Sequence, residues 1–420
     1  MRLVIFTLHY PYGAGEPFLE DELRVAEKEF DRILIVSSHK CTETRITRYI
    51  PHNAEVISIR SDSNDMLRRI VALRFLLTPR AIRELLHSCC ERGWKKIFSN
   101  AVRVLLVEDK VHCLEKKQAT WLKNESNEPT IYYSYWLGAD SIYMARHRKE
   151  LNGLCISRAH GGDCFFDRAY HPYRAETLKS LNAVFSISEM GRNDILQHYV
   201  SKVKSLESKI ITSRMGVGLP EKQSTQSLPD DRRVLCTVSN VIPLKRLDLL
   251  IDALAEIQNV DIHWVHFGDG AIFENIKALA KEKLDAKENI TYEFRGRVAN
   301  TKIYEFYTEQ PVDLFINCSD VEGIPVSVME AMSFGIPAIA RNVGGVSEII
   351  DNSCGLLLPE MITPTELKEG ILKVLSESNE EHQIKCNNAR RKIESEYNCK
   401  KNYGLFVEHI KRMMKEHAGE

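Results

Sequence analysis

The stretch CSDVEGIPVSVMEAMSFGIPAIA, Cys318 to Ala340, predicts a parallel-sheet unit. The residues before it, VDLFIN, predict a buried strand; VSVMEAMS predicts a helix, and PAIA predicts the next strand. Pro325 suits the first position of that helix, and Gly335 is expected to end it. A strand, a helix and a second strand in this order are the repeating unit of an α/β fold.

The same alternation of short apolar segments and longer helical patterns occurs in both halves of the chain. The first half predicts strands at Leu3–Leu8, Ile33–Val36, Glu55–Ile59, Ile131–Tyr135, Cys155–Ala159, Ala183–Ser186 and Lys209–Thr212. The second half predicts strands at Val234–Val238, His263–Phe267, Thr291–Phe294, Asp313–Asn317, Pro337–Ala340 and Gly355–Leu357. We therefore expect an α/β protein with two Rossmann-like, doubly wound parallel sheets.

A polar stretch separates the two halves. LPEKQSTQSLPDDRR, Leu219 to Arg233, contains two prolines and has no apolar period, which is typical of a linker. We expect an N-terminal domain at 1–218, a linker at 219–232 and a C-terminal domain at 233–396. The last residues, 397–420, have the apolar period of an amphipathic helix, which we expect to pack back toward the N-terminal domain.

Composition limits the class of protein. The 420 residues are 44% apolar and 27% charged with a net charge of −1, which is typical of a soluble globular chain and gives no overall preference for polyanions such as nucleic acid. The eleven cysteines show no paired spacing, which favours reduced thiols. The opening MRLVIFTLHYPYG predicts a first strand rather than an export signal, and no apolar stretch is long enough to span a bilayer. We expect a cytoplasmic location, which includes the inner face of the cytoplasmic membrane.

Two glutamates in the opening stretch are candidates for ligand contacts. Glu322 follows a strand at its carboxyl end, where open α/β sheets bind ligands. The helix after it has free N–H groups that suit a diphosphate. Glu330 lies inside an apolar helix, where a carboxylate needs a partner. We expect that partner to be a pair of ribose hydroxyls supplied by a ligand; a cap or an interhelical salt bridge is the alternative.

EGIPVSVMEAMSFGIPAIARNVGGVSEII, Glu322 to Ile350, resembles the signature of the family-4 glycosyltransferases. These are retaining enzymes with the GT-B fold, in which two Rossmann-like domains face a cleft. The resemblance implies that Glu330 holds the donor ribose and that Glu322 contacts hydroxyls of the transferred sugar. It implies that backbone groups of Gly323 and Ile324 meet the sugar and the phosphates. The expected reaction moves a hexose-type sugar from a nucleotide diphosphate sugar, such as a UDP-sugar, to a hydroxyl acceptor in polysaccharide biosynthesis.

The segment VSNVIPLKRLDLLIDAL corresponds to the phosphate-binding segment of that family, which usually reads Gly-Arg-x-x-x-x-Lys-Gly. This chain has Asn240 in place of the arginine, Lys245 at the lysine, and Arg246 in place of the second glycine. A cation at Lys245 would stabilise the charge that grows on the leaving diphosphate. Arg246 either adds a second phosphate contact or faces solvent.

Three further loops carry weaker donor-binding signals. The resemblance implies that the turn at Gly268 lines the nucleotide pocket and that backbone groups near Arg297 and Val298 meet the base. The loop with Gly13 and Gly15 is expected to face the donor diphosphate and the acceptor, although a plain β-to-α turn is the alternative.

Four more residues complete the predicted site. His160 follows a strand in the sequence HGGD, and in the family a histidine here contacts the transferred sugar. Asp163 is expected either to orient that imidazole or to bind acceptor. Glu16 is either an acceptor contact or a first-turn residue, and Arg214 is expected at the cleft mouth near phosphate. The predicted catalytic residues are His160, Glu322 and Lys245.

The sequence is compatible with three functions, of which glycosyl transfer is the first. No Asp-x-Asp motif occupies a strand-end loop, so we expect no metal and no cofactor besides the donor substrate. The first alternative is a nucleotide-sugar 2-epimerase of the same architecture, which needs no acceptor. The second is a non-catalytic nucleotide-sugar binder, which Asn240 would favour if it disables phosphate binding.

The segment Met66 to Leu105 contains nine Lys and Arg but two Glu, with apolar and aromatic residues between them. A basic amphipathic segment of this kind suits anionic lipid headgroups and would make the acceptor a lipid-linked intermediate. The alternative is a solvated helix face whose apolar side lies in the core.

Overall fold

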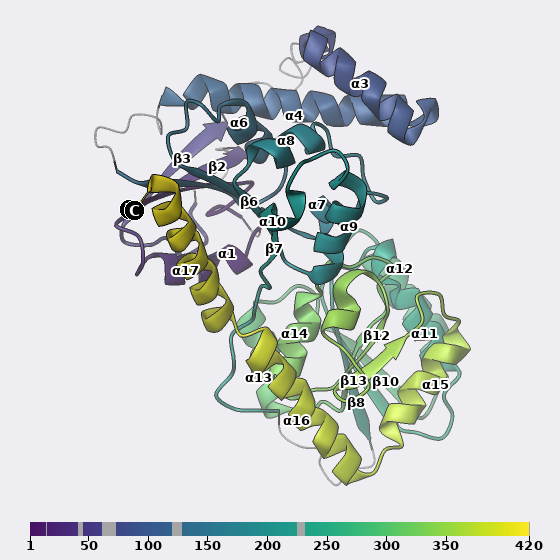
Figure 1. The fold of residues 1–420 in the computed structure, drawn as a ribbon. Helices are drawn as coiled ribbons and strands as arrows, with labels where there is room; N and C mark the ends of the chain where they lie inside the picture. The colour runs from purple at the N-terminus through teal and green to yellow at the C-terminus, as the bar shows by residue number, and fades with distance from the viewer. Residues whose placement is uncertain (14, 41–44, 61–72, 120–127, 225–231, 420) are drawn as a thin grey trace. The chain divides into compact units, whose positions relative to one another are not determined.

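The computed structural model describes residues 1–13, 15–40, 45–60, 73–119, 128–224 and 232–419. The chain divides into two compact units. Unit 1 consists of Met1–Ser213 together with Tyr403–Glu420, and unit 2 consists of Arg214–Asn402 (Figure 1).

Within its described residues, unit 1 contains a seven-stranded parallel sheet. The spatial order is β3 (Ala54–Arg60), β2 (Arg32–Lys40), β1 (Arg2–Thr7), β4 (Thr130–Ser134), β5 (Leu154–Ala159), β6 (Ala183–Ser186) and β7 (Ile210–Thr212). Successive side chains of β1 point to opposite faces, as a strand requires. Leu3 and Ile5 pack with the face covered by α1 (Phe18–Ala26) and α17 (Cys399–Ala418), while Val4 and Phe6 pack with the other face.

The second face of this sheet is covered by helices that come between the strands. They include α4 (Ile97–Lys117), α6 (Ala139–Arg146), α8 (Arg174–Ser180) and α9 (Glu189–Tyr199). Five shorter or more peripheral elements are α3 (Pro79–Arg92), α7 (Gly161–Cys164), α10 (Leu206–Lys209) and the 3-10 turns η1 (Leu73–Leu77) and η2 (Trp94–Lys96). Figure 1 shows α3 outside α4, away from the sheet.

The described residues of unit 2 form a second parallel sheet of six strands. Its order is β10 (Ile290–Phe294), β9 (Ile262–Phe267), β8 (Arg233–Val238), β11 (Leu314–Asn317), β12 (Ala338–Arg341) and β13 (Gly355–Leu358). The helices are α11 (Leu247–Ala255), α12 (Phe273–Leu284), α13 (Asn300–Glu309), α14 (Val326–Ser333), α15 (Pro364–Leu375) and α16 (Asn379–Glu396), with 3-10 turns η3 (Pro243–Lys245) and η4 (Gly344–Glu348). The helices α11, α12 and α15 share one apolar core with the sheet.

All thirteen predicted strands are present, and the expectation of two Rossmann-like parallel sheets is confirmed. The helix predicted after Glu322 is α14. Pro325 occupies the N-cap position, one residue before the first helical residue, where the sequence predicted it as that first residue. Gly335 lies just beyond the end of the helix with φ of 79°, a backbone conformation that glycine tolerates best.

The segment Arg214–Gly218 belongs to unit 2, although the sequence placed its boundary after residue 218. Val217 N–H donates to the Tyr397 carbonyl at 2.8 Å, and Cys399 N–H donates back to the Val217 carbonyl at 3.1 Å. These bonds tie the strand-like segment to the start of α17. From Tyr403 onward α17 belongs to unit 1, where Phe406 and Ile410 join the core under β1.

Within the part of the chain that the structure describes, none of the helices combines the length and the apolar character needed to cross a membrane.

Candidate functional site

The chain reverses its strand order in unit 2 between β8 and β11, which are hydrogen-bonded neighbours. Loops at the carboxyl ends of two such strands meet at the place where open α/β sheets bind ligands. The loop after β8 carries Lys245, and the loop after β11 carries Glu322. Lys245 Nζ lies 2.6 Å from Glu322 Oε1, and Asn317 Nδ2 donates to the same oxygen at 3.2 Å. The fold therefore brings two of the predicted catalytic side chains into direct contact.

A backbone bond and a buried arginine hold these two loops together. Asp320 N–H donates to the Leu244 carbonyl at 2.8 Å, which joins one loop to the other. The guanidinium of Arg341, at the end of β12, donates to the Cys318 carbonyl at 3.0 Å and forms an ion pair with Asp320. Because Arg341 is buried, this arrangement fixes the loop that presents Glu322.

Arg246 and Asn240 are the two residues of the predicted phosphate-binding segment that differ from the family pattern. Arg246 has a left-handed backbone with φ of 49°. Its guanidinium lies 3.2 Å from Asp248 and 3.3 Å from Asp320, so both carboxylates neutralise it in this state. The side chain of Asn240 is exposed. Of the two predicted phosphate-binding cations, Lys245 is the one that contacts Glu322, while Arg246 pairs with Asp248 and Asp320.

Glu330 has partners within the chain, which corrects the expectation that only a ligand would supply them. Tyr304 Oη donates to Glu330 Oε1 at 2.7 Å, and Asn300 Nδ2 donates to the same oxygen at 3.1 Å. Both donors lie on α13, so these contacts are interhelical hydrogen bonds from two neutral side chains to the carboxylate. The carboxylate is buried and fixed in orientation before any ligand binds.

Glycines in the adjacent loops allow close approach of one backbone to another. A Cβ on Gly268 would lie 1.8 Å from the Ser239 carbonyl oxygen, and its φ is 142°. A Cβ on Gly345 would lie 2.7 Å from the side chain of Ile324, and its N–H donates to the Gly323 carbonyl at 2.7 Å. Gly268 is therefore required for packing against the β8 loop, whatever it does for a nucleotide.

Arg297 and Val298 follow β10 at the same edge of the sheet. Arg297 is exposed and Val298 is half-buried. The preceding residue, Gly296, is tied to the β9 loop because its carbonyl accepts from Gly268 N–H at 2.8 Å.

In unit 1, Glu16 organises the loop after β1. Its carboxylate accepts the N–H groups of Leu8, His9 and Tyr10 at 2.9, 2.7 and 2.7 Å, and Trp136 Nε1 at 2.6 Å. Glu16 is buried and has a left-handed backbone with φ of 53°. It is not a first-turn residue, because α1 begins at Phe18 and the Glu16 carboxylate holds the loop backbone; its contact with acceptor stays a prediction.

The two predicted glycines of this loop, Gly13 and Gly15, come just before Glu16. Gly13 has φ of 64°, and its carbonyl accepts from Thr47 Oγ1 at 2.8 Å. A Cβ on Gly15 would come within 3.0 Å of the His9 side chain. The loop is thus a packed turn of defined shape.

His160 follows β5 and is enclosed by aromatic rings. Its ring centroid lies 4.8 Å from that of Tyr135 and 4.3 Å from that of Trp136. Burial, with a smaller contribution from the charge of Arg158, lowers the pKa of His160 to about 3, so the imidazole is neutral near pH 7. Its Nε2 has no hydrogen-bond partner among the described residues.

The hydrogen bonds of the Asp163 carboxylate go to backbone N–H groups and not to the imidazole of His160. Its Oδ2 accepts the backbone N–H of His160 at 3.1 Å and of Leu137 at 3.2 Å. Burial raises the pKa of Asp163 above its usual value, with Arg174 opposing that shift. The residue therefore fixes the backbone that carries His160.

Arg214 pairs within unit 2 rather than standing alone. Its guanidinium lies 3.5 Å from Glu348 Oε2 and over the ring of Tyr397. Burial lowers the pKa of Arg214, but Tyr397 and Glu348 oppose this effect and leave the pKa raised above its usual value.

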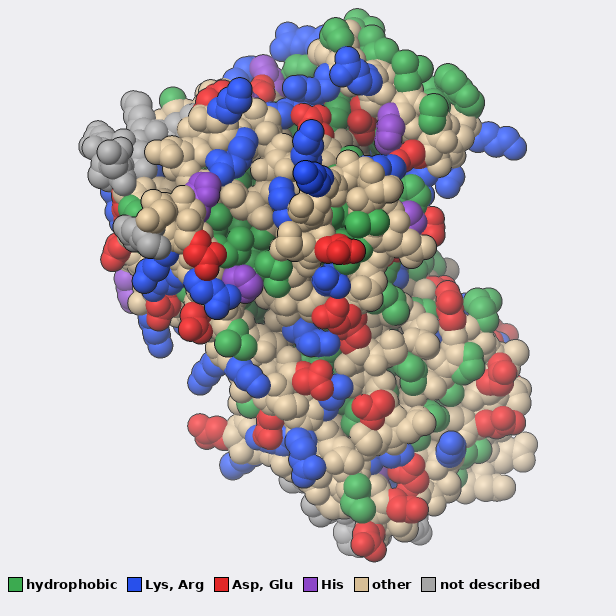
Figure 2. Space-filling model, viewed as in Figure 1, with side chains coloured by type: hydrophobic (Ala, Val, Ile, Leu, Met, Phe, Trp, Pro, Cys, Tyr) green, Lys and Arg blue, Asp and Glu red, His purple; other side chains and the backbone are tan. Residues whose placement is uncertain are grey.

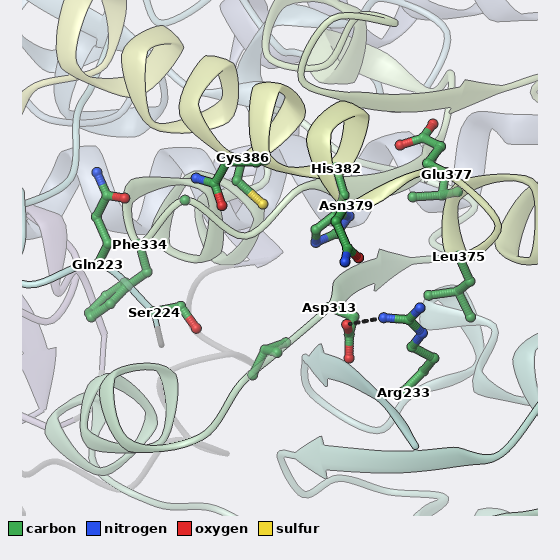
Figure 3. Close-up of a pocket in the computed structure, with 14 residues that line it drawn as sticks. Gln223, Ser224, Arg233, Asp313, Phe334, Leu375, Glu377, Asn379, His382 and Cys386 are labelled. Carbon is green, nitrogen blue, oxygen red and sulfur yellow. Dashed lines mark hydrogen bonds and ion pairs between the residues drawn. The ribbon is translucent and has the colours of Figure 1, made fainter. Parts of the chain in front are cut away.

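A cavity of about 190 Å³ lies at the amino ends of the unit 2 strands, opposite the carboxyl ends that carry Lys245 and Glu322 (Figure 3). It is lined by residues at the amino ends of strands, including Arg233 and Asp313, and by His382 and Cys386 of α16. Arg233 and Asp313 form an ion pair at 3.3 Å in its wall. None of the predicted site residues lines this cavity, so it is separate from the Lys245–Glu322 contact.

Comparison with known proteins gives these contacts a context. Residues 220–392 match the family model described as "Glycosyl transferases group 1". They form a glycosyl transferases group 1 domain. This domain contains Lys245, Glu322 and Glu330, together with every side chain that contacts them above.

Relatives and solved structures agree with the glycosyltransferase domain. The chain is 32% identical over 145 residues to the uncharacterized glycosyltransferase MJ1178 of Methanocaldococcus jannaschii, which covers 34% of this chain and 38% of that protein. It is 26% identical over 283 residues to the O-antigen biosynthesis glycosyltransferase WbnH of Escherichia coli, covering 64% and 75%. The chain thus spans well under half of the first relative and three quarters of the second.

The similarity of fold extends over both units. The lipopolysaccharide outer core galactosyltransferase WaaB, in its apo form, matches 97% of this chain and 100% of its own with a TM-score of 0.67 and 16% identity. The fold is that of GT-B glycosyltransferases, with two Rossmann-like domains.

Sequence reasoning missed the side chains that support the site. Asn317, at the end of β11, had a usable signal because it is a polar residue at a strand carboxyl end. Tyr304 and Asn300 had none, since their contact with Glu330 depends on how α13 packs on α14. Among the described residues, no group of three or more His, Cys, Asp or Glu is arranged to hold a metal ion.

Proposed function

We propose that this chain is a glycosyltransferase that moves a hexose-type sugar from a nucleotide diphosphate sugar to a hydroxyl acceptor. The observation that carries the proposal is the 2.6 Å contact between Lys245 and Glu322 at the strand-order reversal of a glycosyl transferases group 1 domain. A cation and a hydrogen-bonding carboxylate there match what a departing diphosphate and a sugar require.

Lys245 is assigned to the diphosphate. As the bond between sugar and phosphate breaks, charge grows on the leaving oxygen, and a fixed cation stabilises that state more than the ground state. The lysine is presented by a turn whose backbone is bonded to the opposite loop, so little reorganisation is needed. The donor diphosphate must compete with Glu322 for the ammonium group, and Glu322 then accepts hydroxyl hydrogen bonds from the sugar.

Glu330 is assigned to the ribose and His160 to the transferred sugar. Tyr304 and Asn300 hold the Glu330 carboxylate in one orientation, which suits recognition of a diol. The neutral His160 has an unpartnered Nε2 that can bond a sugar hydroxyl without introducing a charge. Backbone groups of Gly323, Ile324, Arg297 and Val298 are assigned to the sugar, the phosphates and the base.

The proposed reaction keeps the anomeric configuration and uses no metal. Retention by a front-face displacement, in which the leaving phosphate takes the acceptor proton, is consistent with a site whose described carboxylates are tied to other groups. The acceptor class, a lipid-linked or polysaccharide intermediate, is supported by the O-antigen biosynthesis relative.

The test measures donor binding first and turnover second. A thermal-shift panel of UDP- and GDP-sugars should identify a donor, since a specific ligand raises the melting temperature by mass action. That donor is then incubated with and without glycan acceptors, and released nucleoside diphosphate is measured, with EDTA added in a parallel series.

Each outcome separates one candidate function from the others. Acceptor-dependent diphosphate release that persists in EDTA, with the product anomer matching the donor anomer, supports the proposal. An epimeric donor formed without acceptor identifies an epimerase. Donor binding with no conversion under any acceptor identifies a binder and overturns the proposal.

A further inference from the structure

Exposed apolar side chains gather on one part of unit 1. Nine of the seventeen large apolar side chains that are exposed in the described residues lie between positions 73 and 106, a segment made of η1, α3, η2 and the first part of α4. We call this segment the basic hairpin. The nine exposed apolar residues of the basic hairpin are Leu73, Leu77, Ile82, Leu86, Trp94, Ile97, Phe98, Val102 and Leu106. Single exposed apolar residues are ordinary, but a contiguous cluster marks an interaction surface.

The cluster has helical order. On α4, Phe98, Val102 and Leu106 follow one another at intervals of four and are exposed, while Asn100, Val104 and Val111 of the same helix are buried. An amphipathic helix in a core needs only one apolar stripe, so α4 has a second stripe directed outward. On α3, Ile82 and Leu86 form a matching exposed pair.

The most exposed aromatic residues lie at the turn between the helices, in the sequence WKKIF. Trp94 is 67% exposed and Phe98 is 82% exposed, and Lys95 and Lys96 lie between them. An aromatic ring beside a lysine is the combination that suits the boundary between lipid headgroups and acyl chains, because the ring enters the apolar layer while the lysine stem lets its ammonium remain at the headgroups.

Charge on the basic hairpin is sorted by direction. Its exposed charged side chains are all basic: Arg74, Arg80, Arg83, Lys95, Lys96 and Arg103. Its two acids, Glu84 and Glu91, are half-buried and bonded inward. Glu84 accepts from Tyr173 N–H at 2.6 Å and from the Tyr170 hydroxyl, and Glu91 pairs with Lys202. The outer surface is therefore positively charged, although the chain as a whole has a net charge of −1.

Figure 2 shows this arrangement. Apolar side chains gather along the upper edge of unit 1, over α3 and the start of α4, with Lys and Arg among them. A second copy of the chain is disfavoured as the occupant, because a two-fold contact would place six cations against six cations.

We infer that the basic hairpin is a docking surface for an anionic lipid bilayer, with Trp94 and Phe98 inserted among the headgroups and the surrounding Lys and Arg bound to lipid phosphates. This goes beyond the proposed reaction, since the surface lies on α3 and α4 and shares none of the assigned site residues. The structure divides the described part of the basic amphipathic segment predicted at Met66–Leu105 into a helical hairpin, while residues 66–72 lie outside the described residues.

The test is co-sedimentation of the full chain with phosphatidylcholine vesicles, with and without phosphatidylglycerol. The parent should bind the anionic vesicles, and rising sodium chloride should release it. Trp94→Ser with Phe98→Ser, and separately Lys95→Glu with Lys96→Glu, should each weaken binding by about tenfold or more, since each basic residue near an anionic surface contributes severalfold.

Matched control variants change similar residues elsewhere. Met361→Ser with Ile384→Ser removes two exposed apolar side chains of unit 2, and Lys281→Glu with Lys400→Glu reverses two exposed lysines. Both should bind vesicles like the parent. The tryptophan emission of the parent should shift to the blue with anionic vesicles, and Trp94→Phe should abolish that shift.

Three results would overturn the inference. They are a parent that does not bind anionic vesicles, control variants that lose binding as much as the hairpin variants, and a dimer in sedimentation velocity that the Trp94/Phe98 variant dissociates. None of these measurements uses donor or acceptor, so failure here leaves the proposed glycosyl transfer untouched.

Discussion

The hydroxyl of Tyr304 donates to Glu330 at 2.7 Å, so a carboxylate inside an apolar helix is partnered by the neighbouring helix. The bond orients one oxygen of the carboxylate without neutralising its charge. Both the stability of unit 2 and its affinity for a nucleotide should therefore depend on Glu330, and the two effects can be separated.

Glu330→Gln should keep the partners on α13, since an amide oxygen still accepts, but should lose the charged acceptor proposed for the ribose. We expect nearly unchanged urea denaturation and affinity for nucleoside diphosphate that falls about tenfold, in line with 1.5–3 kcal/mol for a hydrogen bond to a charged group. Glu330→Ala should in addition lower the free energy of unfolding by about 1–3 kcal/mol. Calorimetric titration measures the affinity. Tyr292→Phe, which removes a hydroxyl bonded to Asp285 in the same unit, is the control. Parent-like affinity in Glu330→Gln would disprove the ribose assignment.

Lys245→Ala should reduce kcat by about 10²–10³, the usual effect of removing one group that stabilises transition-state charge. Its effect on stability should stay within about 1 kcal/mol, because the ion pair with Glu322 is partly exposed. Lys368→Ala provides a comparison, since Lys368 Nζ lies 3.1 Å from Glu256 and the lysine side chain is 23% exposed against 22% for Lys245. Initial rates of diphosphate release test this, and equal rates for Lys245→Ala and the parent contradict the assignment.

Glu16→Ala should destabilise unit 1 by about 2–3 kcal/mol, because four N–H donors would lose a charged acceptor. The change should appear in the emission of Trp136, whose indole N–H donates to Glu16. Glu20→Ala, which breaks an exposed pair with Arg24, should change stability by no more than about 0.5 kcal/mol. If both variants unfold at the same urea concentration as the parent, Glu16 does not hold the loop.

Acid should destabilise the chain in part through His160. Its folded pKa, about 3, lies below the value of about 6.5 for an unfolded histidine, so the unfolded state binds more protons between these values. Stability is therefore unaffected by this group above pH 7 and falls as the pH drops toward 3. His160→Asn should remove on the order of 1–2 kcal/mol of the loss between pH 7 and 5. Melting temperatures across that range test it, with the exposed His417→Asn as the control; identical pH dependence in parent and His160→Asn would rule it out.

The parallel sheets could be predicted from sequence because their signal is local. Each strand is a short apolar run and each helix an apolar period, and both lie within a few neighbouring residues. The proximity of Lys245 and Glu322 could also be predicted from sequence, since both follow strands at their carboxyl ends and such ends share one edge of a sheet.

The hydrogen-bond partners of buried polar groups could not be predicted from the sequence. Glu330 bonds a tyrosine 26 positions earlier, and Glu16 bonds a tryptophan 120 positions later. The sequence shows only that a buried carboxylate needs a donor. Which donor it finds depends on how one helix is rotated against another, and that follows from the packing of apolar side chains on both.

Sequence by itself determined the two sheets, the order of their strands along the chain and the loops that carry the candidate site, because backbone periodicity and turn residues act over short distances. Tertiary structure alone decided that Arg246 is neutralised by Asp248 and Asp320, that Glu16 holds a loop, and that the acids of the basic hairpin turn inward while its cations stay exposed. Hydrogen bonds and ion pairs need specific atoms within about 3 Å of one another, and only the packed fold brings atoms from distant parts of the chain that close.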